Sequence, residues 1–126
     1  MDHMQEEKRE ALQALEEYLQ KLVPGMATLC GELKGSRQPD TDVFQNQCMD
    51  GLNWAVEVYN RVSDVLDLER IHISKQEMNG QLCALGAAIR DQEDRTIAEI
   101  LENTIMPFLK ELGAAARQAA ASSSGE

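Results

Sequence analysis

Aromatic residues and long apolar runs are scarce in this sequence, and each scarcity narrows what it can form. The few aromatic residues are Phe44, Phe108, Trp54, Tyr18 and Tyr59, so aliphatic side chains must fill most of any core. No run approaches the roughly 18 apolar residues of a membrane-spanning helix. The first ten residues, MDHMQEEKRE, are charged where a secretory signal needs an apolar stretch. We therefore expect neither a membrane-spanning segment nor a secretory signal.

Basic residues are also few. Twelve Lys and Arg against 22 Asp and Glu give a formal net charge of −10. Nucleic-acid backbones and anionic membrane surfaces would repel such a chain, so we expect neither nucleic acid nor membrane as a partner. The cysteines, Cys30, Cys48 and Cys83, are odd in number and far apart, which suits reduced thiols in the cytoplasm better than a disulfide framework. The sequence leaves open whether any of them is reactive.

Residues that carry chemistry are sparse. The two histidines, His3 and His72, each lack a second ligand on the same helical face, which argues against zinc and di-iron sites. The acidic stretch Asp91, Glu93 and Asp94 lacks the spacing of a calcium-binding loop. No glycine-rich phosphate loop is present. We therefore predict no catalytic, cofactor-binding or metal-binding residues, and a protein that is not an enzyme.

Apolar residues instead recur with a helical period in four segments. The clearest is 43–68, where one stripe roughly 80° wide holds the apolar side chains and the opposite face is polar. The stripe consists of Phe44, Cys48, Leu52, Ala55, Tyr59, Val62 and Leu66. A first helix is predicted from near Gln5 to Leu33, and a fourth from Ile97 to Leu112. Each of these two contains a proline, Pro24 or Pro107, which should kink it.

The start of the third helix has the strongest local signal in the chain. Ser74-Lys75-Gln76-Glu77 is typical of a capping box, in which the serine side chain accepts a hydrogen bond from the N–H group three residues later. Ile73 and Met78 stand at the positions of a hydrophobic staple around this cap. Polar residues 90–96 should then form the turn into the fourth helix.

Together these patterns predict an all-α fold, an antiparallel four-helix bundle with proline-kinked first and last helices. We expect one domain over residues 1–126, with an ordered core at about 8–115 and a polar tail at 122–126. The predicted core residues are Leu52, Tyr59, Leu82, Leu101, Ile105 and Phe108. Whether the first helix is kinked or split at Pro24 stays open.

Three segments of the chain suggest a family. DGLNWAVEVYN at 50–60, IAEILENTIMPFLKELG at 97–113 and LVPG at 22–25 resemble small bacterial all-helical proteins that form a domain of unknown function. The resemblance spans roughly residues 9–113 and implies a helical fold without implying an activity. The layout is also similar, more faintly, to the helical chaperones of flagellar export, which are small, acidic and cytoplasmic.

Trp54 is the main candidate for function, because it lies beyond one edge of the second helix's apolar stripe. It is either a half-buried bundle aromatic or an anchor in a partner interface, where tryptophan is enriched. Met49 and Met106 also project off the stripes and would extend an adaptable apolar patch. We predict a protein-interaction module that acts as an adaptor, a chaperone or a homodimer. The alternative is a bundle that binds a small apolar ligand between kinked helices.

Overall fold

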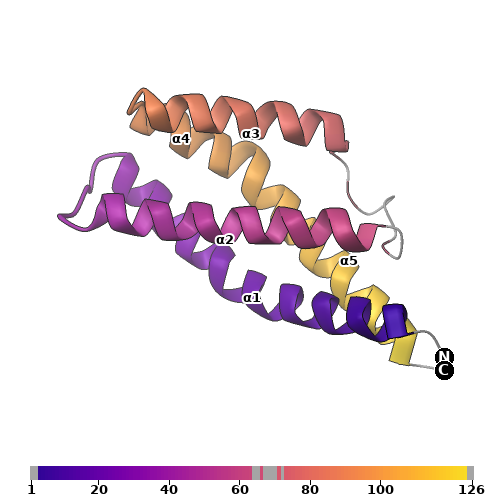
Figure 1. Ribbon diagram of the computed structural model, residues 1–126. Helices are drawn as coiled ribbons and strands as arrows, with labels where there is room; N and C mark the ends of the chain where they lie inside the picture. The colour runs from indigo at the N-terminus through magenta and orange to yellow at the C-terminus, as the bar shows by residue number, and fades with distance from the viewer. Residues whose placement is uncertain (1–2, 64–65, 67–70, 72, 125–126) are drawn as a thin grey trace.

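The computed structural model describes residues 3–63, 66, 71 and 73–124 of the 126-residue chain (Figure 1). The first three helices are α1 (His3–Leu33), α2 (Thr41–Val62) and α3 (Lys75–Arg90). The last helical segment divides into α4 (Asp94–Ile100), a π-helical turn η3 (Leu101–Ile105) and α5 (Met106–Ser124). These described ranges contain no strand, which confirms the all-α bundle.

Helix α1 is the centre of the packing. It lies against α2 on one side and against α4 and α5 on another, whereas α3 packs chiefly against α4 (Figure 1). Five of the predicted core residues, Leu52, Tyr59, Leu101, Ile105 and Phe108, are buried. The Tyr59 and Phe108 rings meet edge to face, with centroids 5.2 Å apart, and so join α2 to α5.

Leu82 was predicted to be buried and is only half-buried. It lies on α3, where only Met78, Leu85 and Ala88 are fully buried. The reason is that α3 has α4 as its main neighbour, so fewer of its side chains are enclosed. A periodic stripe shows which face is apolar, but its burial depends on how many elements cover it.

The chain responds differently to its two helix-interior prolines. Helix α1 continues through Pro24 as a single α-helix. Before Pro107, the N–H of Met106 donates to the carbonyl of Leu101, five residues earlier, and this places a π-helical turn next to the proline. The predicted kinks and the antiparallel packing stay predictions.

The caps agree in part with the sequence. Ser74 caps α3 as predicted, and its Oγ accepts a hydrogen bond from the Glu77 N–H at 3.0 Å. Asp40 occupies the N-cap position of α2 without a side-chain cap, whereas the buried Thr41 hydroxyl donates to Glu32 at 2.8 Å. The turn after α3 is shorter than predicted, because α4 already begins at Asp94.

Two predicted boundaries differ from the structure or fall outside it. Helix α2 ends at Val62, and of the predicted continuation to Leu68, residues 64–65 and 67–68 lie outside the described residues. Helix α5 extends to Ser124, so part of the predicted polar tail at 122–126 is helical. Residues 125–126 lie outside the described residues.

Candidate functional site

Trp54 and Tyr18 form an aromatic pair where α1 and α2 meet. Their ring centroids are 5.2 Å apart and their planes are inclined at 81°, which is a favourable edge-to-face geometry. Trp54 keeps 38% of its surface exposed, whereas Tyr18 is half-buried. The Tyr18 ring restricts the Trp54 side chain while leaving it open to solvent. Binding of a partner to Trp54 would therefore cost little side-chain conformational entropy.

Gly51 makes this arrangement possible. It lies on α2, one turn before Trp54, and a Cβ atom at this position would overlap the Tyr18 hydroxyl. Any side chain at position 51 would therefore push Tyr18 away from α2. The glycine lets the tyrosine ring reach across the interface and lie beside Trp54.

The aromatic pair borders a groove of about 440 Å³. Its lining residues are Tyr18, Gln47, Asp50, Gly51 and Trp54, so it has an aromatic wall and a polar rim with one carboxylate. We call this the Trp54 groove. Trp54, which the sequence predicted as a partner contact, is exposed to solvent at this groove.

Met49 and Met106, the other two predicted contact residues, are not among the residues that line the Trp54 groove. Both are half-buried and pack against the core, Met49 from α2 and Met106 from the start of α5. The structure therefore keeps Trp54 at an open surface without gathering the methionines beside it. Tyr18 and Gly51 lie beside Trp54, where the sequence had predicted the two methionines. An isolated glycine inside a strong helical pattern was the signal for such a close approach.

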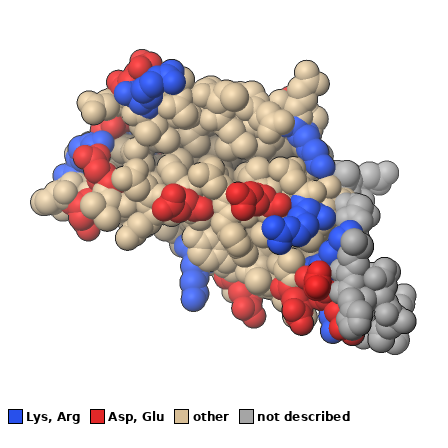
Figure 2. All heavy atoms as spheres, in the orientation of Figure 1, with Lys and Arg blue, Asp and Glu red and all other residues tan. Residues whose placement is uncertain are grey.

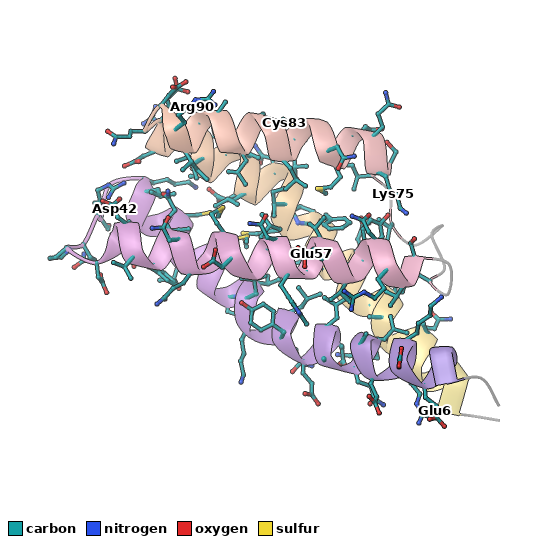
Figure 3. All side chains as sticks on the ribbon, viewed as in Figure 1. Glu6, Asp42, Glu57, Lys75, Cys83 and Arg90 are labelled. Atoms are coloured by element: carbon teal, nitrogen blue, oxygen red, sulfur yellow. The ribbon has the colours of Figure 1, made fainter. Side chains whose placement is uncertain are left out.

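The two helices that border the Trp54 groove carry exposed carboxylates. Exposed carboxylates flank the aromatic residues in sequence, Glu17 beside Tyr18 on α1 and Glu57 one turn beyond Trp54 on α2. Figure 3 shows Glu57 on α2, and Figure 2 shows Asp and Glu side chains, with some Lys and Arg side chains between them, over the face that carries α1 and α2. The net charge of −10 for the chain as a whole favours the approach of cationic groups.

A second apolar groove, of about 370 Å³, lies between α1 and α5. Its apolar lining includes Leu19, Val23, Pro24, Leu109 and Gly113. Near its edge, Arg117 Nε lies 3.0 Å from Glu16 Oε1 and links the two helices. Pro24 therefore borders open apolar space, as the ligand-binding alternative requires, whereas Pro107 is not among its lining residues.

The buried thiols are chemically quiet. Burial raises the pKa of both Cys30 and Cys48 to about 11, so both stay protonated near neutral pH. Cys83 is exposed on α3 (Figure 3). Within the described ranges, no group of three or more His, Cys, Asp or Glu residues could hold a metal ion. His72 and the side chain of His3 lie outside the described residues.

The fold and its grooves define an all-α helical bundle with open apolar surface between helices. Residues 10–115 match the family model described as Domain of unknown function (DUF8042), and the chain belongs to that family. This confirms the resemblance to a helical domain of unknown function. No curated protein and no solved structure matches the chain. The likeness to flagellar export chaperones stays a prediction.

The length and apolar character of the helices bear on the expected absence of a membrane-spanning segment. Among the described helices, none combines the length and the apolar character needed to cross a bilayer. The cytoplasmic location, the single domain and the absence of enzymatic activity stay predictions.

Proposed function

We propose that this protein is a protein-binding module that takes a basic amphipathic helix of a partner into the Trp54 groove. The observation that carries the proposal is Trp54 itself, 38% exposed and fixed against Tyr18 in an apolar groove between two helices. Tryptophan is among the residues that contribute most to binding energy at interfaces. Grooves between helices are a common seat for an amphipathic helix.

The carboxylates at and near the groove favour a basic partner. Asp50 lines the groove, and Glu17 and Glu57, which are close in sequence to Tyr18 and Trp54, are exposed. A partner helix that places an apolar side chain against Trp54 and Lys or Arg side chains at the rim would meet complementary charge. A second copy of this chain is also acidic, so self-association through this groove would bring like charges together.

Site-specific cross-linking tests this proposal. A photo-activated cross-linking residue replaces Gln47 at the groove, and in a control chain it replaces Gln118, which is exposed on α5. We expect the chain labelled at position 47 to capture a basic helical segment in cells, and the chain labelled at position 118 to capture none of it. A self-adduct at position 47 would show a homodimer instead, and the absence of any adduct specific to position 47 would contradict the proposal.

Charge reversal at the rim gives the matched variant. Asp50→Lys should weaken capture because it repels a basic partner, and Glu99→Lys, an equal change at an exposed position on α4, should not. Trp54→Ser should also abolish capture. However, it removes the ring that packs on Tyr18, so some stability is lost as well. Asp50→Lys is therefore the cleaner variant, and thermal melts of all three would show whether folding is preserved.

A second candidate function is the binding of a small apolar ligand in the groove beside Pro24. The observation that favours it is about 370 Å³ of mainly apolar open space between α1 and α5. A side chain at Gly113 would enter this space beside Leu19. Gly113→Val should therefore displace an apolar fluorescent dye if the dye binds here, while Asp50→Lys should leave its binding unchanged. Equal dye binding by both variants would rule this groove out.

A further inference from the structure

Val43 is exposed on α2, the helix that also carries Trp54. It keeps 60% of its surface exposed, and Val43 and Trp54 are the exposed large hydrophobic residues among those that the structure describes. Val43 is not among the residues that line the Trp54 groove. One exposed apolar side chain is ordinary on a protein surface, so its position relative to Trp54 decides whether it belongs to a binding surface.

Val43 and Trp54 lie on the same side of α2. They are eleven residues apart, and at 100° per residue their directions differ by only about 20°. Because α2 is one continuous α-helix over Thr41–Val62, a rise of 1.5 Å per residue places them about 16.5 Å apart along its axis. Gln47 and Asp50 stand between them on the same side, and both are exposed and line the Trp54 groove. We call these four residues the α2 strip.

Helix α1 contacts α2 near both ends of the α2 strip (Figure 1). At one end, the Tyr18 ring lies against the Trp54 ring. At the other end, a Cβ atom at Gly25 of α1 would lie 3.9 Å from the ring of Phe44, the residue after Val43. The junction of α1 and α2 therefore extends along the whole strip, and a partner helix on the strip would lie beside that junction.

The charge of the α2 strip favours a basic partner. Asp50 is its one charged residue, and it is exposed between the two apolar ends. Among the described residues, no ion pair holds the Asp50 carboxylate. A partner that places a Lys or Arg between two apolar side chains would therefore match both the charge and the apolar ends.

A second copy of this chain fits the strip less well. An antiparallel copy would set its Val43 on Trp54 and its Gln47 on Asp50. The same alignment would set Glu57 of each copy opposite Asp40 of the other, and both carboxylates are exposed. Since each copy also carries a net charge of −10, repulsion opposes this dimer.

We infer that the partner helix binds lengthwise along α2 and carries two apolar anchors eleven residues apart, one for Trp54 and one for Val43, with a Lys or Arg opposite Asp50. The spacing follows because both helices rise by the same amount per residue. This inference rests on the proposed function. It adds Val43 as a second anchor position, which selects among basic helices by the spacing of their apolar residues.

Two synthetic peptides of identical composition test the spacing. Each is an alanine-based helix of about 20 residues with two leucines and a lysine four residues inside the first leucine. The matched peptide has its leucines eleven residues apart, and the mismatched peptide has them nine apart, which puts the second leucine on the opposite side of the helix. Trp54 is the one tryptophan of the chain, so its fluorescence reports binding at this surface.

The full chain should bind the matched peptide at least fivefold more tightly than the mismatched one, because only the matched peptide covers Val43. Equal affinity for the two peptides would overturn the inference while leaving the proposed function in place. If neither peptide bound, the proposed function would be contradicted as well.

Variants of the chain locate the second anchor. Val43→Ser should remove the preference for the matched peptide, and the exposed position makes loss of folding unexpected. Ala84→Ser, at an exposed position on α3, should leave the preference unchanged. Asp50→Lys should weaken the binding of both peptides. Thermal melts of the three variants show whether each is folded.

The pattern of losses separates the inference from the proposed function. If Asp50→Lys weakens binding and Val43→Ser keeps the preference, the partner uses the Trp54 groove alone and the inference is wrong. If neither variant changes binding, both proposals fail. Sedimentation of the unliganded chain completes the test, because a dimer that Val43→Ser dissociates would show that a second copy occupies the strip.

Discussion

Gly51 and Gly80 both lie inside helices, but their surroundings differ. A Cβ atom at Gly51 would overlap the Tyr18 hydroxyl, whereas a Cβ atom at Gly80 on α3 would meet open space. Sequence position alone treats the two alike, since glycine in a helix interior is unfavourable by about 1 kcal/mol relative to alanine wherever it occurs. The structure separates a glycine that a close contact requires from one that it does not.

The first prediction compares alanine at these two positions. Gly51→Ala should lower the free energy of unfolding by about 1–3 kcal/mol, as expected when a side chain is forced into a packed contact. Gly80→Ala should raise it by about 0.5–1 kcal/mol, because alanine restricts the unfolded chain and strains nothing in the folded one. Urea denaturation of both variants measures the difference. Equal effects at the two positions would mean that Tyr18 does not lie over Gly51.

The second prediction concerns the thiols. In the native protein, Cys83 should react quickly with a thiol reagent, and Cys30 and Cys48 should react only when the chain unfolds. Burial raises the pKa of both buried thiols to about 11. A raised pKa means that the folded state binds protons more tightly, so stability should fall as the pH rises from about 9 toward 11. Reagent titration with and without denaturant checks the first statement, and melts at alkaline pH check the second.

At the scale of the elements, the sequence predicted where helices occur, but it did not predict how their neighbours change their geometry. The apolar stripe of 43–68 and the Ser74 cap indicated α2 and the start of α3 because periodicity and capping are local properties. The π-helical turn at Leu101–Ile105 was missed. A proline predicts a missing hydrogen bond, but whether the chain bends or widens one turn depends on packing around it.

The third prediction tests how far the helices are covered. Leu101 is fully buried in the π-helical turn, whereas Leu82 on α3 is half-buried, although both belong to apolar stripes. Leu101→Ala should therefore cost about 2–5 kcal/mol of unfolding free energy, and Leu82→Ala should cost clearly less. Chemical denaturation measures both. If the two costs were equal, α3 would be enclosed as fully as the last helical segment, contrary to its packing mainly against α4.

For the whole molecule, the arrangement of helices was beyond the reach of the sequence. Four amphipathic segments imply a bundle, but they do not state that α1 is central or that α3 has α4 as its main neighbour. The same limit applies to the sites. Trp54 was predicted from its place beyond a stripe, whereas its pairing with Tyr18 was not, because the two residues come from segments far apart in the chain.

Contacts between distant segments also join the loop after α1 to the starts of α2 and α4. Arg37, in the loop after α1, binds Asp94 at the start of α4 through two hydrogen bonds, and it also binds Asp42 at the start of α2. The hydrogen bonds from Arg37 hold the pKa of Asp94 below its usual range. A carboxyl group whose pKa is lower in the folded chain than in the unfolded chain stabilises the fold at any pH above its pKa in the unfolded chain. This contribution is lost as the pH falls through its pKa in the folded chain.

The fourth prediction follows from that sign. At pH 7, Asp94→Asn should lower the unfolding free energy by less than about 1 kcal/mol, because the pair is partly exposed and solvent screens it. The deficit should shrink as the pH falls below about 4, where the parent chain loses the same interaction. Asp91→Asn, at an exposed carboxylate 4.0 Å from Arg90, should change little at either pH. Since protonation also relieves repulsion across a chain of net charge −10, the difference between parent and variant is the quantity to compare. A deficit that stays constant from pH 7 to pH 3 would mean that Asp94 acts through packing and not through its charge.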